Sequence, residues 1–160
     1  MLSFRTDGPV LDPREFTGEL AKAKPAVANT NELTTDTLAI GDKMPDGTVY
    51  AGISPETNKP MYATPADAPL LMGFDKAKEY AAELDAHGHR DWRVPTKAEL
   101  NVLFNNRVAI GGFSSIGSRP AGWYWSSSQD DTWSAWDQRF SDGARCGLWK
   151  DGHCSLRCVR

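Results

Sequence analysis

The chain has 160 residues, enough for one domain or for a domain with an appended segment, and at this size a core needs no disulfide bonds. Its 18 Lys and Arg residues against 21 Asp and Glu residues give a net charge of −3, which argues against a nucleic-acid-binding surface. No apolar run reaches the about 18–20 residues of a membrane-spanning helix, so we expect no membrane insertion.

Residues 1–39 are polar, contain Pro9, Pro13 and Pro25, and show no apolar period that would build a core element. We interpret this segment as a poorly structured arm or linker, with an alternative role as a docking or homo-oligomerisation arm. Its first residues lack the basic and apolar regions of a secretory signal, so we expect cytoplasmic synthesis. Display on a virion, or at a surface by a non-classical route, stays open. Residues 40–160 then form the domain.

The first elements of the domain are a hairpin and a helix. Val49, Ala51 and Ile53 alternate along a predicted strand, and residues 54–60 form a turn that leads to a short return strand. Apolar residues recur at helical spacing over residues 74–86, and Gly88 follows where a C-terminal cap would end that helix.

A second helix is predicted to begin after Thr96, a favourable N-cap, with Glu99 three residues later as its capping-box partner. A Gly/Ser-rich loop follows over residues 109–122, and five of the six tryptophans come after it. Alternation there predicts a small antiparallel sheet that ends in a closing strand at residues 156–160, with Trp136 in the core. Two helices placed before a sheet of hairpins indicate an α+β domain.

The cysteines and acidic residues of the C-terminal stretch raise two hypotheses of metal binding, one for zinc and one for calcium. Cys154 and Cys158 have the spacing of one zinc-binding pair, but Cys146 lacks a paired ligand at such a spacing, and His153 beside Cys154 would crowd a ligand. A disulfide is an alternative, although the odd count argues against full pairing. The acidic residues do not follow an EF-hand spacing, so no cofactor is expected, with calcium kept as an alternative at Asp130, Asp131, Asp137, Asp142 and Asp151.

Two tryptophans fall in stretches that look like exposed loops. Trp133 and Trp149 lie among Asp, Arg, Ser and Gly residues, a composition typical of a recognition surface. The alternative is that both indoles cap the core from above.

Four separated motifs resemble the Lcl C-terminal domain family. They are residues 88–100 (GHRDWRVPTKAEL), residues 124–128 (YWSSS), residues 135–136 (AW) with residues 140–143 (FSDG), and residues 157–160 (RCVR). The segments 40–42 and 46–50 are similar to the family's opening, so the resemblance covers about residues 40–160.

The resemblance implies a C-type-lectin-like fold, shared with formylglycine-generating enzymes and with variable proteins of diversity-generating retroelements. It also implies non-catalytic recognition of a protein or glycan by the C-terminal hairpins, as on adhesins and on phage or bacterial surface proteins. The four motifs are scaffold in this interpretation. The residues between them are the candidate ligand-binding surface: Gln129, Asp130, Asp131, Trp133, Asp137, Arg139, Arg145, Leu148, Trp149, Asp151 and His153.

Departures from related families bear on the alternatives. The glutamate-proline-asparagine and tryptophan-asparagine-aspartate motifs of calcium-dependent lectins are absent, so calcium-mediated sugar binding is not implied. The catalytic cysteine pair of formylglycine-generating enzymes has no clear counterpart. An oxidase that uses Cys154 and Cys158 stays as one alternative, and a structural virion or appendage component that assembles through residues 1–39 as another.

Overall fold

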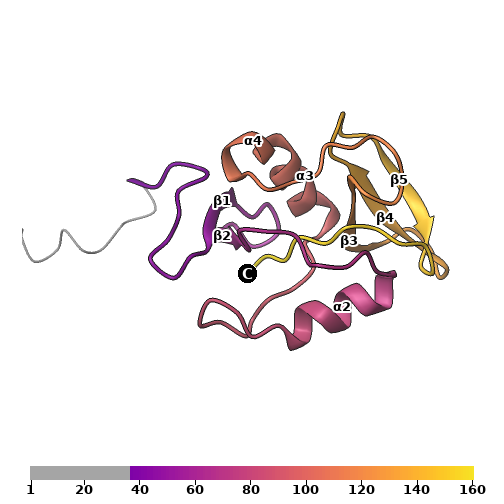
Figure 1. Cartoon of the computed structure of the whole chain (residues 1–160), viewed down its shortest axis with the longest axis horizontal. Coiled ribbons are helices and arrows are strands. Elements are labelled where there is room, and N and C mark those ends of the chain that lie inside the picture. Colours follow the sequence, from indigo (N-terminus) through magenta and orange to yellow (C-terminus); the bar gives the residue numbers. More distant parts are fainter. Residues whose placement is uncertain (1–36) are drawn as a thin grey trace, which may run out of the picture. The chain divides into compact units, whose positions relative to one another are not determined.

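Three helices and two small antiparallel sheets make up residues 37–160, the part of the chain that the computed structural model describes (Figure 1). One sheet pairs β1 (Val49–Ile53) with β2 (Pro60–Ala63), and the other has the order β3 (Trp123–Gln129), β4 (Ser134–Arg139) and β5 (Arg145–Trp149). The helices are α2 (Phe74–Glu83), α3 (Lys97–Asn105) and α4 (Arg107–Ile110). The predicted α+β class is confirmed, whereas the arm predicted for residues 1–39 lies almost wholly outside the described residues.

The first hairpin forms where the sequence predicts it, but Ile53, at the end of β1, faces solvent and not the core. Val49 pairs with Ala63 and Ile53 with Pro60, and the register shifts between Tyr50 and Gly52. Such a bulge adds one residue to the strand and reverses the alternation beyond it. Ile53 is therefore 43% exposed, and its predicted place on the buried face is wrong.

Helix α2 ends at Glu83, three residues before the predicted end, because Leu84 adopts an extended conformation. The chain then reverses in a tight turn in which Ala86 and His89 exchange backbone hydrogen bonds of 3.1 and 3.0 Å. Both central residues, His87 and Gly88, have positive φ angles, as a type I′ turn requires. Gly88 thus serves this turn and does not cap the helix.

Helix α3 begins with the capping box that the sequence predicts. The Thr96 hydroxyl accepts a hydrogen bond from the Glu99 backbone N–H at 3.2 Å, and the Glu99 carboxylate accepts one from the Thr96 N–H at 2.9 Å. The predicted loop over residues 109–122 begins later than expected, because α4 extends the helical region to Ile110.

The second sheet contains two strands that the sequence predicts and a third that it does not predict. Residues 145–149, expected as a loop, form β5, which pairs with β4 from Gln138 opposite Arg145 to Ser134 opposite Trp149. The predicted closing strand at residues 156–160 joins neither sheet as a regular strand.

Residues 154–160 instead run as an extended segment between distant parts of the chain. Tyr62 and Arg160 exchange backbone hydrogen bonds of 3.0 and 2.9 Å, and Met72 and Cys154 exchange two of 3.1 Å. A further bridge joins Val159 to Arg93. The segment is buried from Cys154 to Val159, so it forms part of the core rather than a tail.

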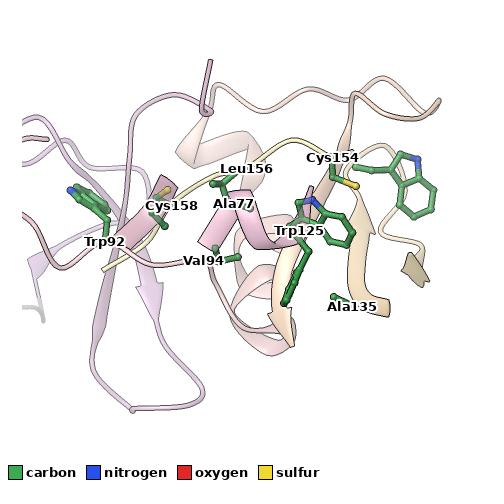
Figure 2. Packing of buried hydrophobic residues seen from close by; sticks show 11 residues of the cluster. Ala77, Trp92, Val94, Trp125, Ala135, Cys154, Leu156 and Cys158 are labelled. Atoms are coloured by element: carbon green, nitrogen blue, oxygen red, sulfur yellow. The ribbon is translucent and has the colours of Figure 1, made fainter. Parts of the chain in front are cut away.

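Two clusters of buried apolar side chains form the core. The first lies between α2, β3 and the C-terminal segment, and Figure 2 shows Ala77, Trp125 and Leu156 within it. The second joins β1 and β2 to α3 and includes Phe140, whose ring contacts those of Phe104, Phe113 and Tyr124. Trp136 belongs to neither cluster, contrary to its predicted core position, since its ring is half-buried beneath the Lys97 ammonium at 3.2 Å from the ring centroid.

Candidate functional site

The two faces of β5 are different. Cys146 and Leu148 point inward and pack against the first core cluster, whereas Arg145, Gly147 and Trp149 are exposed. Strand β5 is also an edge strand of its sheet, so one of its backbone edges has no strand partner among the described residues. Period-two alternation therefore places Trp149 outward at the end of a strand, not in the loop that the sequence predicts.

Trp133 and Trp149 lie close together at one end of this sheet. Trp133 is 68% exposed in the turn between β3 and β4, and Trp149 is 66% exposed. The Lys150 backbone N–H donates to the Trp133 carbonyl oxygen at 2.9 Å, which joins the two segments. Both indoles border a surface groove of about 470 Å³, and their exposure shows that neither caps the core.

We call this hollow the tryptophan groove. Its lining comes from three parts of the chain: the β3–β4 turn, the end of β5 with the residues after it, and the first turn of α2. The lining residues are Asp75, Thr132, Trp133, Trp149, Lys150 and Asp151.

The carboxylate of Asp131 stabilises the turn that contains Trp133. It accepts hydrogen bonds from the backbone N–H groups of Trp133 and Ser134, at 2.7 and 2.8 Å. These bonds hold the pKa of Asp131 below its ordinary value, because they stabilise the ionised form. Asp131 thus positions the indole.

The side chain of Lys150, the residue after β5, holds the same turn by two hydrogen bonds. Its ammonium donates to the Gln129 side-chain oxygen at 2.7 Å and to the Thr132 carbonyl oxygen at 2.8 Å. Asp130 lies over Gly147, where an added Cβ would come within 2.4 Å of the Asp130 carboxylate. Both contacts bring residues of the β3–β4 turn against β5.

Asp137, a predicted ligand contact, is 1% exposed and lies on the buried face of β4. It forms an ion pair with Arg119 and accepts hydrogen bonds from the thiols of Cys146 and Cys154, at sulfur–oxygen distances of 3.3 and 3.4 Å. Arg119 also packs over the Trp123 ring, with its guanidinium carbon 4.0 Å from the ring centroid. This buried cluster lies on the other face of the sheet from Trp149.

The other predicted residues are dispersed. Arg139 pairs with Asp142 in the β4–β5 turn, and this pairing lowers the pKa of Asp142 to about 2. Arg145 is exposed at the far end of β5 from Trp149, and Leu148 points into the core. His153 lines a separate groove of about 440 Å³, beside Leu70 and Leu71.

The structure therefore brings together Gln129, Asp130, Asp131, Trp133, Trp149 and Asp151, and separates the other five. It adds Asp75, Thr132 and Lys150, which sequence reasoning missed. Asp75 lies on a helix 58 positions before Trp133, so no local pattern connects the two. Lys150 does carry a signal, as the only lysine after Lys97 in a stretch rich in Asp.

A family model for the Lcl C-terminal domain matches residues 54–160. The chain belongs to the Lcl C-terminal domain family. The match includes α2 to β5, the tryptophan groove and the C-terminal segment, and it begins after β1. A search of curated proteins finds no match to the chain.

The family motif at residues 88–100 serves the scaffold of this Lcl C-terminal domain. The Trp92 indole N–H donates to the Ala86 carbonyl oxygen at 3.1 Å, across the turn after α2. The Arg93 guanidinium binds both oxygens of the buried Glu99, and the Pro95 carbonyl oxygen accepts from the Ser127 N–H at 2.8 Å. The motif thus joins α3 to β3 and does not contribute to the tryptophan groove.

Neither a metal cluster nor a membrane span occurs in the described part of the chain. No three His, Cys, Asp or Glu side chains among residues 37–160 are grouped so that they could hold a metal ion. In the same residues, no helix is both long enough and apolar enough to cross a membrane.

The three cysteines are free, and their environments predict low reactivity. Burial raises the pKa of Cys158 to about 12 and that of Cys154 further still, and it also raises the pKa of the half-buried Cys146. Only the thiolate attacks a disulfide reagent. At pH 8 we expect the folded protein to react slowly at Cys146, with Cys154 and Cys158 reacting only as the protein unfolds. A titration with an aromatic disulfide reagent, with and without denaturant, tests this, and fast reaction of three thiols in the folded protein would contradict it.

Proposed function

We propose that this Lcl C-terminal domain is a non-catalytic recognition domain that binds a protein or glycan ligand through the tryptophan groove. The observation that carries the proposal is the exposure of Trp133 and Trp149, at 68% and 66%, beside a groove. Trp92, Trp123 and Trp125 are by contrast 3%, 8% and 0% exposed in the same domain. Exposed aromatic side chains that lie together on rigid elements supply much of the binding energy of many interfaces.

The rigidity of the site supports a recognition role. Asp131 fixes the backbone at Trp133, Lys150 fastens the turn, and β5 holds Trp149 by strand pairing. A preorganised site loses little conformational entropy on binding. The family resemblance supports a C-type-lectin-like fold. It also implies that the domain belongs to an adhesin, a phage receptor-binding protein or a retroelement-diversified protein. In the last case, a near-copy of the coding region for residues 123–160 would lie beside a reverse-transcriptase gene.

The alternative oxidase function has less support from the thiols. Cys154 and Cys158 lie at different places along the extended C-terminal segment (Figure 2). Four residues of extended chain span about 13 Å, too far for two side chains to act on one atom without rearrangement. Cys154 is 0% and Cys158 2% exposed, and burial raises the pKa of both thiols. These features support a structural role for the cysteines.

A binding screen against glycans and surface proteins tests the proposed function. The intact chain is compared with a Trp133→Ala, Trp149→Ala double variant, and Leu70→Ala serves as the control because Leu70 is 71% exposed beside the other groove. Exposed positions of this kind contribute little to stability, so we expect an unchanged Tm. Binding should be lost in the double variant and kept in the control. Binding that survives the double change would overturn the proposal.

A further inference from the structure

The tryptophan groove has a net negative charge, since the carboxylates of Asp75 and Asp151 outnumber the one ammonium of its lining, that of Lys150. Asp75 and Asp151 are exposed at its rim, and neither carboxylate has a hydrogen bond or ion pair with another group among residues 37–160. Exposed Asp130 and Asp131 lie on the adjoining turn. The groove thus combines two indoles with two free carboxylates.

The cations near the groove are held by groups other than Asp75 and Asp151, although only Lys76 among them is paired with a carboxylate of the described residues. The Lys150 ammonium donates to Gln129 and to the Thr132 carbonyl oxygen, so it points into the turn. Lys76, which follows Asp75 on α2, pairs with Glu79 at 2.7 Å. The Lys78 ammonium lies 5.4 Å from the centroid of the Phe74 ring. An incoming cation therefore meets carboxylates that are not engaged elsewhere.

The indoles complement the same charge. A cation within about 6 Å of an indole centroid is attracted by the negative face of the ring, and the attraction is stronger where water is excluded. This domain already makes such contacts, with Lys97 over Trp136 at 3.2 Å and Arg119 over Trp123 at 4.0 Å. Trp133 and Trp149 have no such partner among the described residues.

We propose that the tryptophan groove binds the Lys or Arg side chains of a basic segment on a protein partner. The cationic group would lie over the indole faces, with Asp75 and Asp151 as its counter-charges. This inference rests on the proposed function and names the ligand class of the same site. Charge complementarity is the argument for this occupant, since a neutral ligand would leave the two carboxylates without a counter-charge and an anionic ligand would be repelled.

Fluorescence anisotropy with a labelled peptide that alternates Gly with Lys and Arg tests the inference on the full chain. Matched peptides with Gln or Glu at the same positions, and a panel of neutral oligosaccharides, are the comparison ligands. We expect the basic peptide to bind at low salt and to weaken as salt rises, and the acidic peptide not to bind.

The decisive variant is Asp75→Asn with Asp151→Asn, and Glu83→Gln is the matched control because it removes charge from an exposed position of α2 outside the groove. The aspartate variant should weaken the basic peptide about tenfold or more, and the control should not. Equal binding of basic and acidic peptides, no binding of the basic peptide, or no effect of the aspartate variant would overturn the inference.

The same experiment separates the two proposals. Binding of neutral oligosaccharides alone, lost in the Trp133→Ala, Trp149→Ala variant, would overturn the cation inference and leave the proposed function standing. Binding of every ligand that persists in that double variant would overturn both.

Discussion

Replacing Glu99 by alanine is expected to lower the free energy of unfolding by about 3–5 kcal/mol, because it removes a buried carboxylate and leaves four hydrogen bonds without their acceptor. The Glu99 side chain is fully buried and accepts four hydrogen bonds. They come from both Arg93 nitrogens at 2.5 and 2.7 Å, from the Ser54 hydroxyl at 2.6 Å and from the Thr96 N–H at 2.9 Å. One carboxylate thus joins the end of β1, the family motif and the start of α3. Denaturant unfolding at pH 7 measures the loss.

The control for this change is Glu79→Ala. Glu79 also pairs with a cation, Lys76, but on the exposed face of α2, where salt bridges contribute little. An equal loss of stability in the two variants would contradict the role assigned to Glu99.

The effect of Glu99 should depend on pH. Burial raises the pKa of Glu99, but the hydrogen bonds from Arg93, Ser54 and Thr96 outweigh it and leave the pKa below the ordinary value of 4.5. A carboxyl group with a lowered folded-state pKa stabilises the protein above its unfolded pKa, and this contribution is lost as the pH falls through the folded pKa. The stability difference between the native chain and Glu99→Gln should therefore shrink below pH 4.5. A difference that grows in acid would contradict this sign.

Replacing Asp137 by alanine is expected to lower the free energy of unfolding by about 2–4 kcal/mol. The loss should be below that at Glu99, because Asp137 accepts one hydrogen bond from Arg119 and two weak ones from thiols, whereas Glu99 accepts four from N–H and O–H donors. The two thiols would lose the acceptor that they share. Thermal or denaturant unfolding measures the cost, and an Asp142→Ala variant, which breaks the exposed pair with Arg139, should change stability much less.

The variant Asp137→Asn tests the role of Asp137 by a second measurement, the reaction rate of Cys146. A loss of stability alone would not change this rate in the folded protein. The Asp137 charge contributes to the raised pKa of Cys146, while Arg119 lowers it. Without the carboxylate, Arg119 acts alone on the sulfur, which it contacts at 2.9 Å. Cys146 should then react faster with an aromatic disulfide reagent at pH 8, and a Cys146→Ser background should remove that faster phase. An unchanged rate in folded Asp137→Asn would contradict the coupling.

Local chemistry made much of the fold predictable. The Thr96–Glu99 capping box and the two hairpins depend on residues a few positions apart, and these were confirmed. The bulge in β1 and the turn at His87 and Gly88 were missed, since both depend on how neighbouring segments pair. Strand β5 was missed because Gly147 interrupts its apolar pattern and its largest side chain, Trp149, faces outward.

The candidate site was predictable only where its residues are close in sequence. Trp133 and Trp149 stood out by their polar surroundings, and the structure joins them. Asp137 resembled a surface residue because its burial depends on Arg119, in a distant loop. Asp75 could not be predicted as a site residue, because only the packing of α2 against the sheet brings it to the groove.

The buried segment from Cys154 to Val159 has a consequence for how the domain acquires its structure. Its hydrogen bonds reach back to Tyr62, Met72 and Arg93, so they connect residues far apart in the chain. Contacts of such high sequence separation slow folding, because a long loop must close before they form. The first hairpin and both main helices are made before their central partner emerges from the ribosome. Until then the apolar side chains that this segment covers stay open to water, and exposed apolar surface of this kind favours aggregation of partly folded chains.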